Sequence, residues 1–242
     1  NKLRGGYYTP DKISEFITDW AVQAPADTVL EPSCGDGSFL NAITHRLKIL
    51  GATRQEVKKN VIGVELDSVE AEKAAQYGTT VVCKDFFSYF REVVDDKKKF
   101  DAIVGNPPFI RYQNFNEEYR EIAFTLMNKY GFKPNRLTNI WLPFLLLSCN
   151  AAEARQFLSG FFDRLTIITF KQLVFDDIQQ EVVLLLGERG CEKHRIRIVE
   201  LNNIEDLISQ GQKCLDTAEQ KQLDTGKDKW VKYYLTNEEL QL

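Results

Sequence analysis

The sequence predicts an α/β fold in which a mixed, mainly parallel sheet carries helices on both faces. Strand-like and helix-like segments alternate through most of the 242 residues, as in sheets whose strands are joined by crossover helices. Apolar residues make up 43% of the chain and charged residues 27%, which is typical of a globular protein. The length suffices for one substantial core with a small appendage.

The predicted elements alternate in type from the first helix onward. That helix places Ile13, Phe16, Ile17 and Trp20 at helical spacing. In chain order the elements are helix Asp11–Ala21, strand Thr28–Glu31, helix Phe39–Leu50, strand Val61–Leu66, helix Ser68–Gln76, strand Thr80–Cys83, strand Phe100–Val104, helices Glu117–Lys129, Leu137–Cys149 and Ala152–Phe162, and strands Leu165–Phe170 and Val182–Leu186.

Two segments depart from this alternation. Helical patterns meet around Cys149–Ala152 with no strand between them, although a helix after the fourth strand should feed a fifth. Residues are therefore expected to be missing at this point. From Gln210 to Asp228 the chain is polar and poor in large apolar residues, which predicts a linker.

Composition argues against several classes of protein. The five cysteines include no C-x-x-C pair and only two histidines accompany them, so no zinc or other metal site is expected. Dispersed thiols predict a reducing, cytoplasmic environment. No stretch approaches the ~20 apolar residues of a membrane span, and no signal peptide opens the chain.

The net charge of −4 argues against a stand-alone nucleic-acid binder, because such proteins usually carry a basic surplus. Contacts to nucleic acid would then lie on a local basic face or outside this chain. The first residue is Asn1 rather than Met, which indicates a trimmed or internal piece.

A glycine turn follows the first strand. Gly35 and Gly37 let the backbone turn sharply and approach a ligand, but the third glycine of the dinucleotide motif G-x-G-x-x-G is lacking. Glu31 ends the strand, where ligands of such sheets bind. Its carboxylate suits a cationic or amino-bearing ligand better than a pyrophosphate. A bare strand-to-helix turn is the alternative.

Acidic residues also follow the next two strands. Glu65 can accept hydrogen bonds from both hydroxyls of a ribose, or is simply a polar strand end. Asp85 and Phe86 can bond an adenine amino group and pack on its ring, or form a helix N-cap with a core phenylalanine. Together with the glycine turn, Glu65 specifies a nucleoside pocket without basic groups for phosphate. S-adenosylmethionine, a nucleoside with a sulfonium and an amino group, matches this pocket.

The segment Asn106-Pro107-Pro108-Phe109 stands directly after the fourth strand. Its prolines fix the backbone and push Asn106 into an extended conformation. The Asn106 side-chain oxygen and the Pro107 carbonyl then form a rigid pair of acceptors for both hydrogens of a planar NH2 group. If this amino group belongs to a nucleic-acid base, Phe109 can stack on that base, and such stacking stabilises binding by ~1–3 kcal/mol. A chance turn is the alternative.

These motifs resemble the N6-adenine DNA methyltransferases of restriction–modification systems, which have a Rossmann-like class I S-adenosylmethionine-dependent methyltransferase fold. Tyr7–Pro10 is similar to their motif X, Glu31–Gly37 to motif I, Glu65 to motif II, Asp85-Phe86 to motif III and Asn106–Phe109 to the catalytic motif IV. Motif X ahead of motif I is the gamma order, in which a target-recognition domain follows the catalytic domain.

The resemblance implies roles for individual residues. Val174-Phe175-Asp176 is similar to the motif VIII region, whose aromatic packs against a flipped adenine; core packing of Phe175 is the alternative. The implied base contacts are Phe109 and Phe175, and the implied catalytic residues are Asn106, Pro107, Pro108 and Phe109. The implied cofactor residues are Tyr8, Thr9, Pro10, Glu31, Pro32, Cys34, Gly35, Gly37, Glu65, Leu66, Asp85, Phe86 and Asn106.

The expected function is in-line methyl transfer from S-adenosylmethionine to adenine N6 in double-stranded DNA. A catalytic domain is expected over residues 1–207, and residues 208–242 as a linker and the start of a largely absent target-recognition region. C5-cytosine chemistry is disfavoured because no Pro-Cys pair occurs. Alternatives are methylation of a protein glutamine or a ribosomal RNA base, or an inactive cofactor-binding module. The glutamine enzymes typically carry tyrosine at the fourth motif position, so Phe109 favours DNA.

Overall fold

The computed structural model describes residues 9–95, 97–110, 114–131, 134, 140–151, 162–172, 174, 182–190 and 195–222. The chain divides into two compact units, Asn1–Arg155 and Gln156–Leu242. Each unit is built around a sheet of its own.

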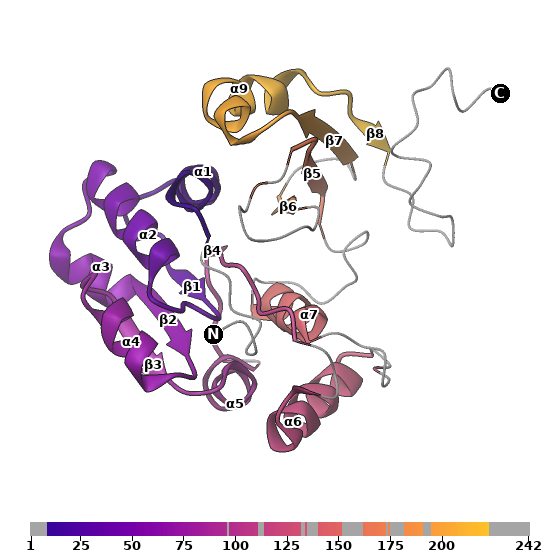
Figure 1. Ribbon diagram of the computed structural model, residues 1–242. Helices are drawn as coiled ribbons and strands as arrows, with labels where there is room; N and C mark the ends of the chain where they lie inside the picture. Colours follow the sequence, from indigo (N-terminus) through magenta and orange to yellow (C-terminus); the bar gives the residue numbers. More distant parts are fainter. Residues whose placement is uncertain are drawn as a thin grey trace. The chain divides into compact units, whose positions relative to one another are not determined.

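The first unit contains a parallel sheet with the strand order β3-β2-β1-β4 (Figure 1). The chain steps outward from β1 to β2 and β3, and then returns to the other side of β1 to form β4. The strand order therefore reverses between β1 and β4, which is where ligands of open α/β sheets bind. The strands are β1 (Val29–Glu31), β2 (Val61–Glu65), β3 (Thr80–Cys83) and β4 (Ala102–Ile103).

Helices cover both faces of this sheet, as the sequence predicts. Val29 and Val61 pack with Leu40 of helix α2 on one face. Leu30 and Val64 point to the other face and pack with the aromatic residues of α5 and with α7. The helices of this unit are α1 (Asp11–Ala21), α2 (Ser38–Ile49), α3 (Arg54–Asn60), α4 (Ser68–Ala75), α5 (Phe86–Tyr89), the π-helical η2 (Phe90–Val94), α6 (Glu117–Lys129) and α7 (Trp141–Ala151).

Most predicted elements of the first unit are confirmed. Helices α1 and α6 and strand β3 have the predicted bounds, and the others begin or end a few residues away. Helices α3 and η2 are absent from the prediction, and α5 corresponds to the helix that was one of two alternatives at Asp85 and Phe86. A capping box marks the start of α3, because the Thr53 hydroxyl accepts from the Glu56 N–H at 3.3 Å and the Glu56 carboxylate accepts from the Thr53 N–H at 2.7 Å.

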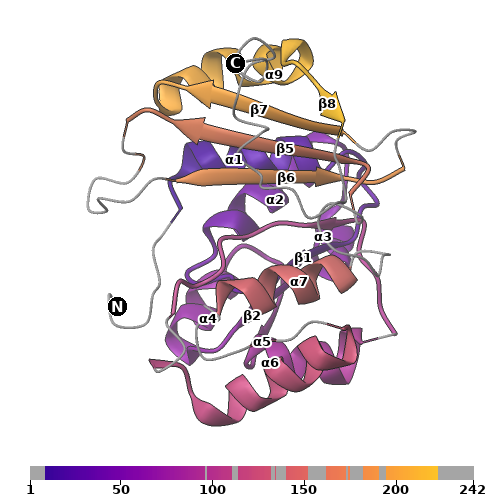
Figure 2. The same cartoon turned by 90° about the vertical axis from the view of Figure 1, so that its right-hand side faces the viewer.

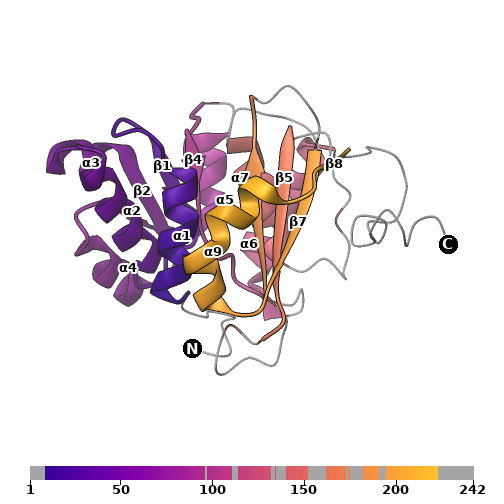
Figure 3. The same cartoon turned by 90° about the horizontal axis from the view of Figure 1, so that it is seen from above.

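The second unit contains a mixed sheet in the order β6-β5-β7-β8 (Figure 2). Strand β5 pairs antiparallel with β6 and parallel with β7, and β8 pairs antiparallel with β7. Helix α9 runs along this sheet (Figure 3). Its elements are β5 (Arg164–Phe170), β6 (Val183–Glu188), β7 (Arg195–Leu201), α9 (Ile204–Thr217) and β8 (Lys221–Gln222).

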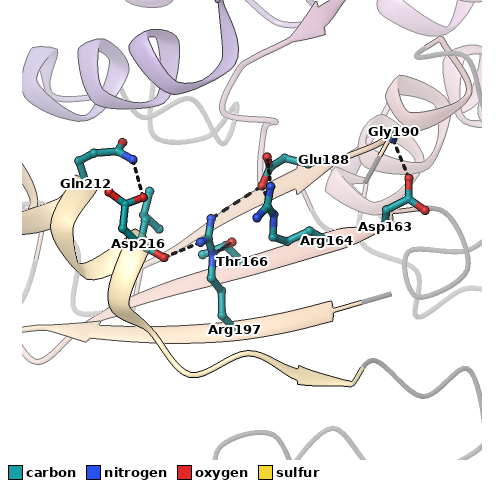
Figure 4. Close-up of polar contacts among 9 residues, drawn as sticks. Asp163, Arg164, Thr166, Glu188, Gly190, Arg197, Gln212 and Asp216 are labelled. Carbon is teal, nitrogen blue, oxygen red and sulfur yellow. Dashed lines mark hydrogen bonds and ion pairs between the residues drawn. The ribbon is translucent and has the colours of Figure 1, made fainter. Parts of the chain in front are cut away.

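A buried arginine joins the sheet of the second unit to α9. Arg197 of β7 is 6% exposed, and its Nε donates to the Thr166 hydroxyl at 2.6 Å. The same guanidinium donates to the carbonyl of Leu215 in α9 and lies 3.7 Å from the Glu188 carboxylate (Figure 4). Arg164 donates to both oxygens of Glu188 at 2.7 and 2.9 Å. One polar network thus spans β5, β6, β7 and α9.

Two predictions for the C-terminal part need correction. The linker predicted over Gln210–Asp228 is wrong in its first part, because residues 210–217 lie in α9. Leu207, Gly211 and Leu215 are buried at a spacing of four residues, so one face of this polar helix packs inward. The predicted elements also omit β7 and β8. The predicted domain boundary between residues 207 and 208 falls inside α9, and as a functional division it stays a prediction.

Several predictions lie outside the described residues. They are the helix Ala152–Phe162 apart from its last residue, Tyr7 and Tyr8 of the motif X segment, and Phe175. The missing residues expected around Cys149–Ala152 stay a prediction, since α7 continues to Ala151 and Ala152 is not described. Among the helices that are described, none has both the length and the apolar character needed to cross a membrane.

Candidate functional site

The predicted site residues gather at the carboxyl edge of the parallel sheet. The register pairs Glu31 with Gly63 and Glu65 with Cys83, so β1, β2 and β3 end at the same edge. The segment after β4 leaves from this edge as well, because Leu30 pairs with Ile103. The motifs that follow these strands therefore lie side by side.

Glu31 is a buried acid with an unused acceptor. Its side chain is 1% exposed, and Oε1 accepts from the Ser33 N–H at 3.3 Å. Oε2 is buried and has no hydrogen-bond partner among the described residues. Removal from water raises the pKa of this carboxyl well above its ordinary value, and the negative charge of Glu65 raises it further. Such a group attracts a cation or a hydrogen-bond donor.

The Asn106–Phe109 segment begins directly against Glu31. A Cβ placed on Gly105 would overlap Oε1 of Glu31, so only glycine leaves room for the carboxylate here. The Ser33 hydroxyl also donates to the Asn106 carbonyl at 3.4 Å. The glycine turn after β1 and the N-P-P-F segment after β4 thus form one continuous surface.

Glu65 shapes the glycine turn from the neighbouring strand. Its Oε2 accepts from the Gly35 N–H at 2.9 Å and its Oε1 accepts from the Asp67 N–H at 2.8 Å. Each carboxylate oxygen keeps further acceptor capacity. Gly37 has a φ of +98°, and a Cβ there would lie 2.7 Å from the ring of Tyr77. A larger residue at position 37 would be strained and would displace this ring.

The motif X segment lies beside the start of α2. Thr9 is 9% exposed, and its carbonyl accepts from the Ser38 hydroxyl at 3.1 Å. Pro10 stands at the N-cap of α1. Since Ser38 follows the glycine turn directly, Thr9 and Pro10 lie next to that turn. Their role in cofactor binding stays a prediction.

Asp85 caps a helix and Phe86 lies in the core, which is the second of the two interpretations of this pair given above. Both Asp85 oxygens cap α5, accepting from the Phe87 N–H at 2.9 Å and the Ser88 N–H at 3.0 Å. Phe86 is 3% exposed and stacks on Phe144 of α7, with ring centroids 5.0 Å apart. The N-cap and the core phenylalanine are therefore confirmed, and contacts of these two residues to a cofactor stay a prediction.

The N-P-P-F segment presents an exposed aromatic ring. Phe109 is 55% exposed, whereas Asn106, Pro107 and Pro108 are half-buried. The Asn106 side chain makes no hydrogen bond to any other described residue. The Phe109 ring lies 6.3 Å from that of Trp141, centroid to centroid, with the planes inclined at 35°. The segment that starts beside the buried Glu31 thus carries an amide without a hydrogen bond to the described residues and, three residues further on, an exposed aromatic ring.

The remaining predicted cofactor residues differ in exposure. Pro32 and Cys34 are buried, and burial raises the pKa of the Cys34 thiol. Leu66 is 52% exposed beyond the end of β2, where its apolar surface is open to a ligand. Gly35 has a positive φ of 53°, in keeping with the predicted sharp turn.

The structure adds three residues that sequence patterns did not single out. Gly105 leaves room for Glu31, Ser33 bonds the Asn106 carbonyl, and Trp141 packs on Phe109. A glycine immediately before N-P-P was a usable signal for the first. The other two depend on contacts between distant parts of the chain, which no local pattern shows.

Comparisons with known proteins agree on one family. A family model described as Eco57I restriction-modification methylase matches residues 43–171. M.AccI, a type II methyltransferase of Acinetobacter calcoaceticus, is 23% identical over 265 residues, which cover 94% of this chain and 46% of M.AccI. The chain thus spans about half of the length of that relative.

Solved structures share the fold. The DrdV–DNA complex has a TM-score of 0.64 at 15% identity, covering 93% of this chain and 31% of that one. A structure described as a class I S-adenosylmethionine-dependent methyltransferase from Listeria monocytogenes has a TM-score of 0.62 at 13% identity, covering 86% and 70%. The predicted class I methyltransferase fold is confirmed.

Proposed function

Since the chain belongs to the family of Eco57I restriction-modification methylases, we propose that it transfers a methyl group from S-adenosylmethionine to the N6 amino group of adenine in DNA. The adenine is flipped out of the double helix, because a stacked N6 cannot reach a cofactor at this sheet edge. The activity is that of a modification enzyme in a restriction–modification system.

One observation carries this proposal: the buried Oε2 of Glu31 has no partner among the described residues and lies where the N-P-P-F segment begins. A lone buried acceptor beside a second carboxylate, Glu65, suits a positively charged nucleoside. Bound S-adenosylmethionine supplies an electrophilic methyl group on a sulfonium. Glu31 would hold its amino group or face its positive charge, and Glu65 would accept from the ribose hydroxyls.

The residues of the N-P-P-F segment orient the acceptor base. The side-chain oxygen of Asn106 and the carbonyl of Pro107 accept the two hydrogens of the amino group. That grip draws the nitrogen lone pair out of ring conjugation and aims it at the methyl group. Phe109, which is 55% exposed, stacks on the base. The C–S bond electrons would return to sulfur as the neutral thioether leaves, and the surplus proton on N6 would pass to water. Catalysis is mainly positioning, so no histidine base is needed.

DNA binding would use a local basic face of this chain or a surface outside it. A net charge of −4 is unfavourable for phosphate contacts. A target-recognition region elsewhere in the protein would supply the basic surface, in keeping with the partial coverage of M.AccI. The DNA in the DrdV complex makes double-stranded DNA the first substrate to test.

The test uses the full-length protein, labelled S-adenosylmethionine and unmethylated bacterial DNA. Digesting the DNA to nucleosides identifies the product as N6-methyladenine, N4-methylcytosine or 5-methylcytosine, and parallel reactions use protein and ribosomal RNA substrates. We expect N6-methyladenine only. Asn106→Ala should lower the transfer rate by at least about 100-fold, since it removes a group that acts in the transition state, while cofactor affinity changes little. Unchanged transfer by this variant would refute the mechanism.

A further inference from the structure

Phe109 is held from one side by a residue of another helix. Its ring lies 6.3 Å from the ring of Trp141, at an interplanar angle of 35°. This is the range of a direct aromatic contact, and it leaves no space for a base stacked in parallel between the two rings. More than half of the Phe109 surface nevertheless stays open to solvent.

A backbone hydrogen bond joins the two segments that carry these rings. The Ile140 N–H donates to the Ile110 carbonyl at 3.1 Å. Phe109 precedes one partner of this bond and Trp141 follows the other, so the bond holds the two residues near each other. The contact between the rings is therefore supported by the backbone as well as by the side chains.

Trp141 has a firmer support than Phe109. It is the first residue of α7, whose residues Phe144 and Leu147 are buried in the core beneath the sheet. Ile140, directly before it, is fully buried. Phe109 stands in a segment without regular structure, with a single short-range backbone bond from the Ile110 N–H to the Pro108 carbonyl.

We propose that Trp141 is a positioning residue that restricts the ring of Phe109, so that its open face is presented to the flipped base. The proposal rests on the proposed methyl transfer for its functional consequence, but the restraint on the ring is a property of the chain alone. Trp141 acts through Phe109 and does not touch the base. The ring pair is pre-organised, so base binding loses less side-chain entropy.

The first experiment measures the restraint without any activity. 4-Fluorophenylalanine is placed at position 109 of the full-length protein, and its ¹⁹F resonance is recorded in the wild-type background and in Trp141→Leu, Trp141→Phe and Trp20→Leu. Trp141→Leu should shift and sharpen the signal, because the indole ring current disappears and the ring rotates more freely. Trp20→Leu, on α1, is the matched control and should leave the signal in place. An unchanged signal in Trp141→Leu would overturn the proposal.

The second experiment is a double-mutant cycle on methyl transfer. Trp141→Leu should lower kcat/KM by about 2- to 12-fold, the effect of losing one aromatic pair, and Trp141→Phe should restore most of that loss. In the Phe109→Ala background Trp141→Leu should have no further effect. Independent, multiplicative losses would overturn the proposal, as would loss of cofactor affinity in Trp141→Leu. Absence of any transfer by the wild type would refute the proposed function and leave the ¹⁹F result to judge the restraint.

Discussion

Replacing Glu31 by glutamine should have opposite effects on the stability of the unliganded protein and on its affinity for the cofactor. The carboxyl is buried, and one of its oxygens has no partner in the part of the chain that the structure describes; desolvation, followed by the charge of Glu65, raises its pKa. Glutamine keeps the shape and removes the charge. We therefore expect the Glu31→Gln variant without ligand to be more stable than the wild type at neutral pH, and to bind S-adenosylmethionine more weakly.

The sign and size of the stability effect follow from linkage. A carboxyl whose folded-state pKa is raised stabilises the fold below its unfolded pKa, near 4.5, and that stability is lost as the pH rises toward the folded pKa. Each pH unit in that window costs the wild type about 1.4 kcal/mol that the glutamine variant does not lose. The two proteins should therefore be alike in acid and diverge as the pH rises.

The affinity of the Glu31→Gln variant for the cofactor should fall although its stability rises. Losing a hydrogen bond to a charged group corresponds to about 10- to 150-fold weaker binding. At a pH below the raised folded-state pKa of Glu31, binding of the cation to the wild type should also release a proton from this carboxyl, and the glutamine variant should lack this release. Glu56→Gln is the matched control: hydrogen bonding by Thr53 lowers the pKa of the exposed Glu56, so its stabilising effect is present at higher pH and is lost as the pH falls.

The assays are urea unfolding between pH 4 and 8 and isothermal titration calorimetry in two buffers of different ionisation enthalpy. The reasoning fails if Glu31→Gln and the wild type lose stability in parallel over this pH range. It also fails if the glutamine variant binds the cofactor as tightly as the wild type does.

Two further substitutions test the fit of Gly105 against Glu31 and, separately, the buried network of the second unit. Gly105→Ala would place a methyl group against Glu31 Oε1, and overpacking of this kind costs about 1–3 kcal/mol of unfolding free energy. Displacement of the carboxylate should also weaken cofactor binding. Wild-type affinity in calorimetry would contradict the overlap. Arg197→Leu removes a 6% exposed guanidinium from Thr166, Glu188 and the Leu215 carbonyl. Breaking such a buried network should lower the free energy of unfolding by about 3–5 kcal/mol, measured by urea unfolding of the second unit. A change below about 1 kcal/mol would show that the network is dispensable.

Sequence patterns predicted the site because its residues sit at strand ends. Glu31, Glu65 and Asn106 each follow a short apolar run, and parallel pairing brings these ends to one edge. The chemical choice at Asp85 could not be made in the same way. Capping α5 and bonding a ligand use the same carboxylate oxygens, so the sequence left both interpretations open.

Helix α9 and the contact of Phe109 with Trp141 were not predicted, because the apolar stripe of α9 is narrow and the ring contact joins residues far apart in the chain. Helix α9 shows mostly polar residues, and its buried stripe consists of Leu207, Gly211 and Leu215 alone. A glycine in that stripe weakens the apolar period that marks a helix. The contact of Phe109 with Trp141 depends on a backbone bond between Ile110 and Ile140, far apart in sequence.

The close fit of Gly105 to Glu31 couples substitutions at these two positions. While a glutamate stands at position 31, any side chain at position 105 meets its carboxylate. An aspartate is one methylene shorter and would withdraw the oxygens from that overlap. Shortening of the acid should therefore reduce the penalty of alanine at position 105, so the effects of the two substitutions on stability should not be additive.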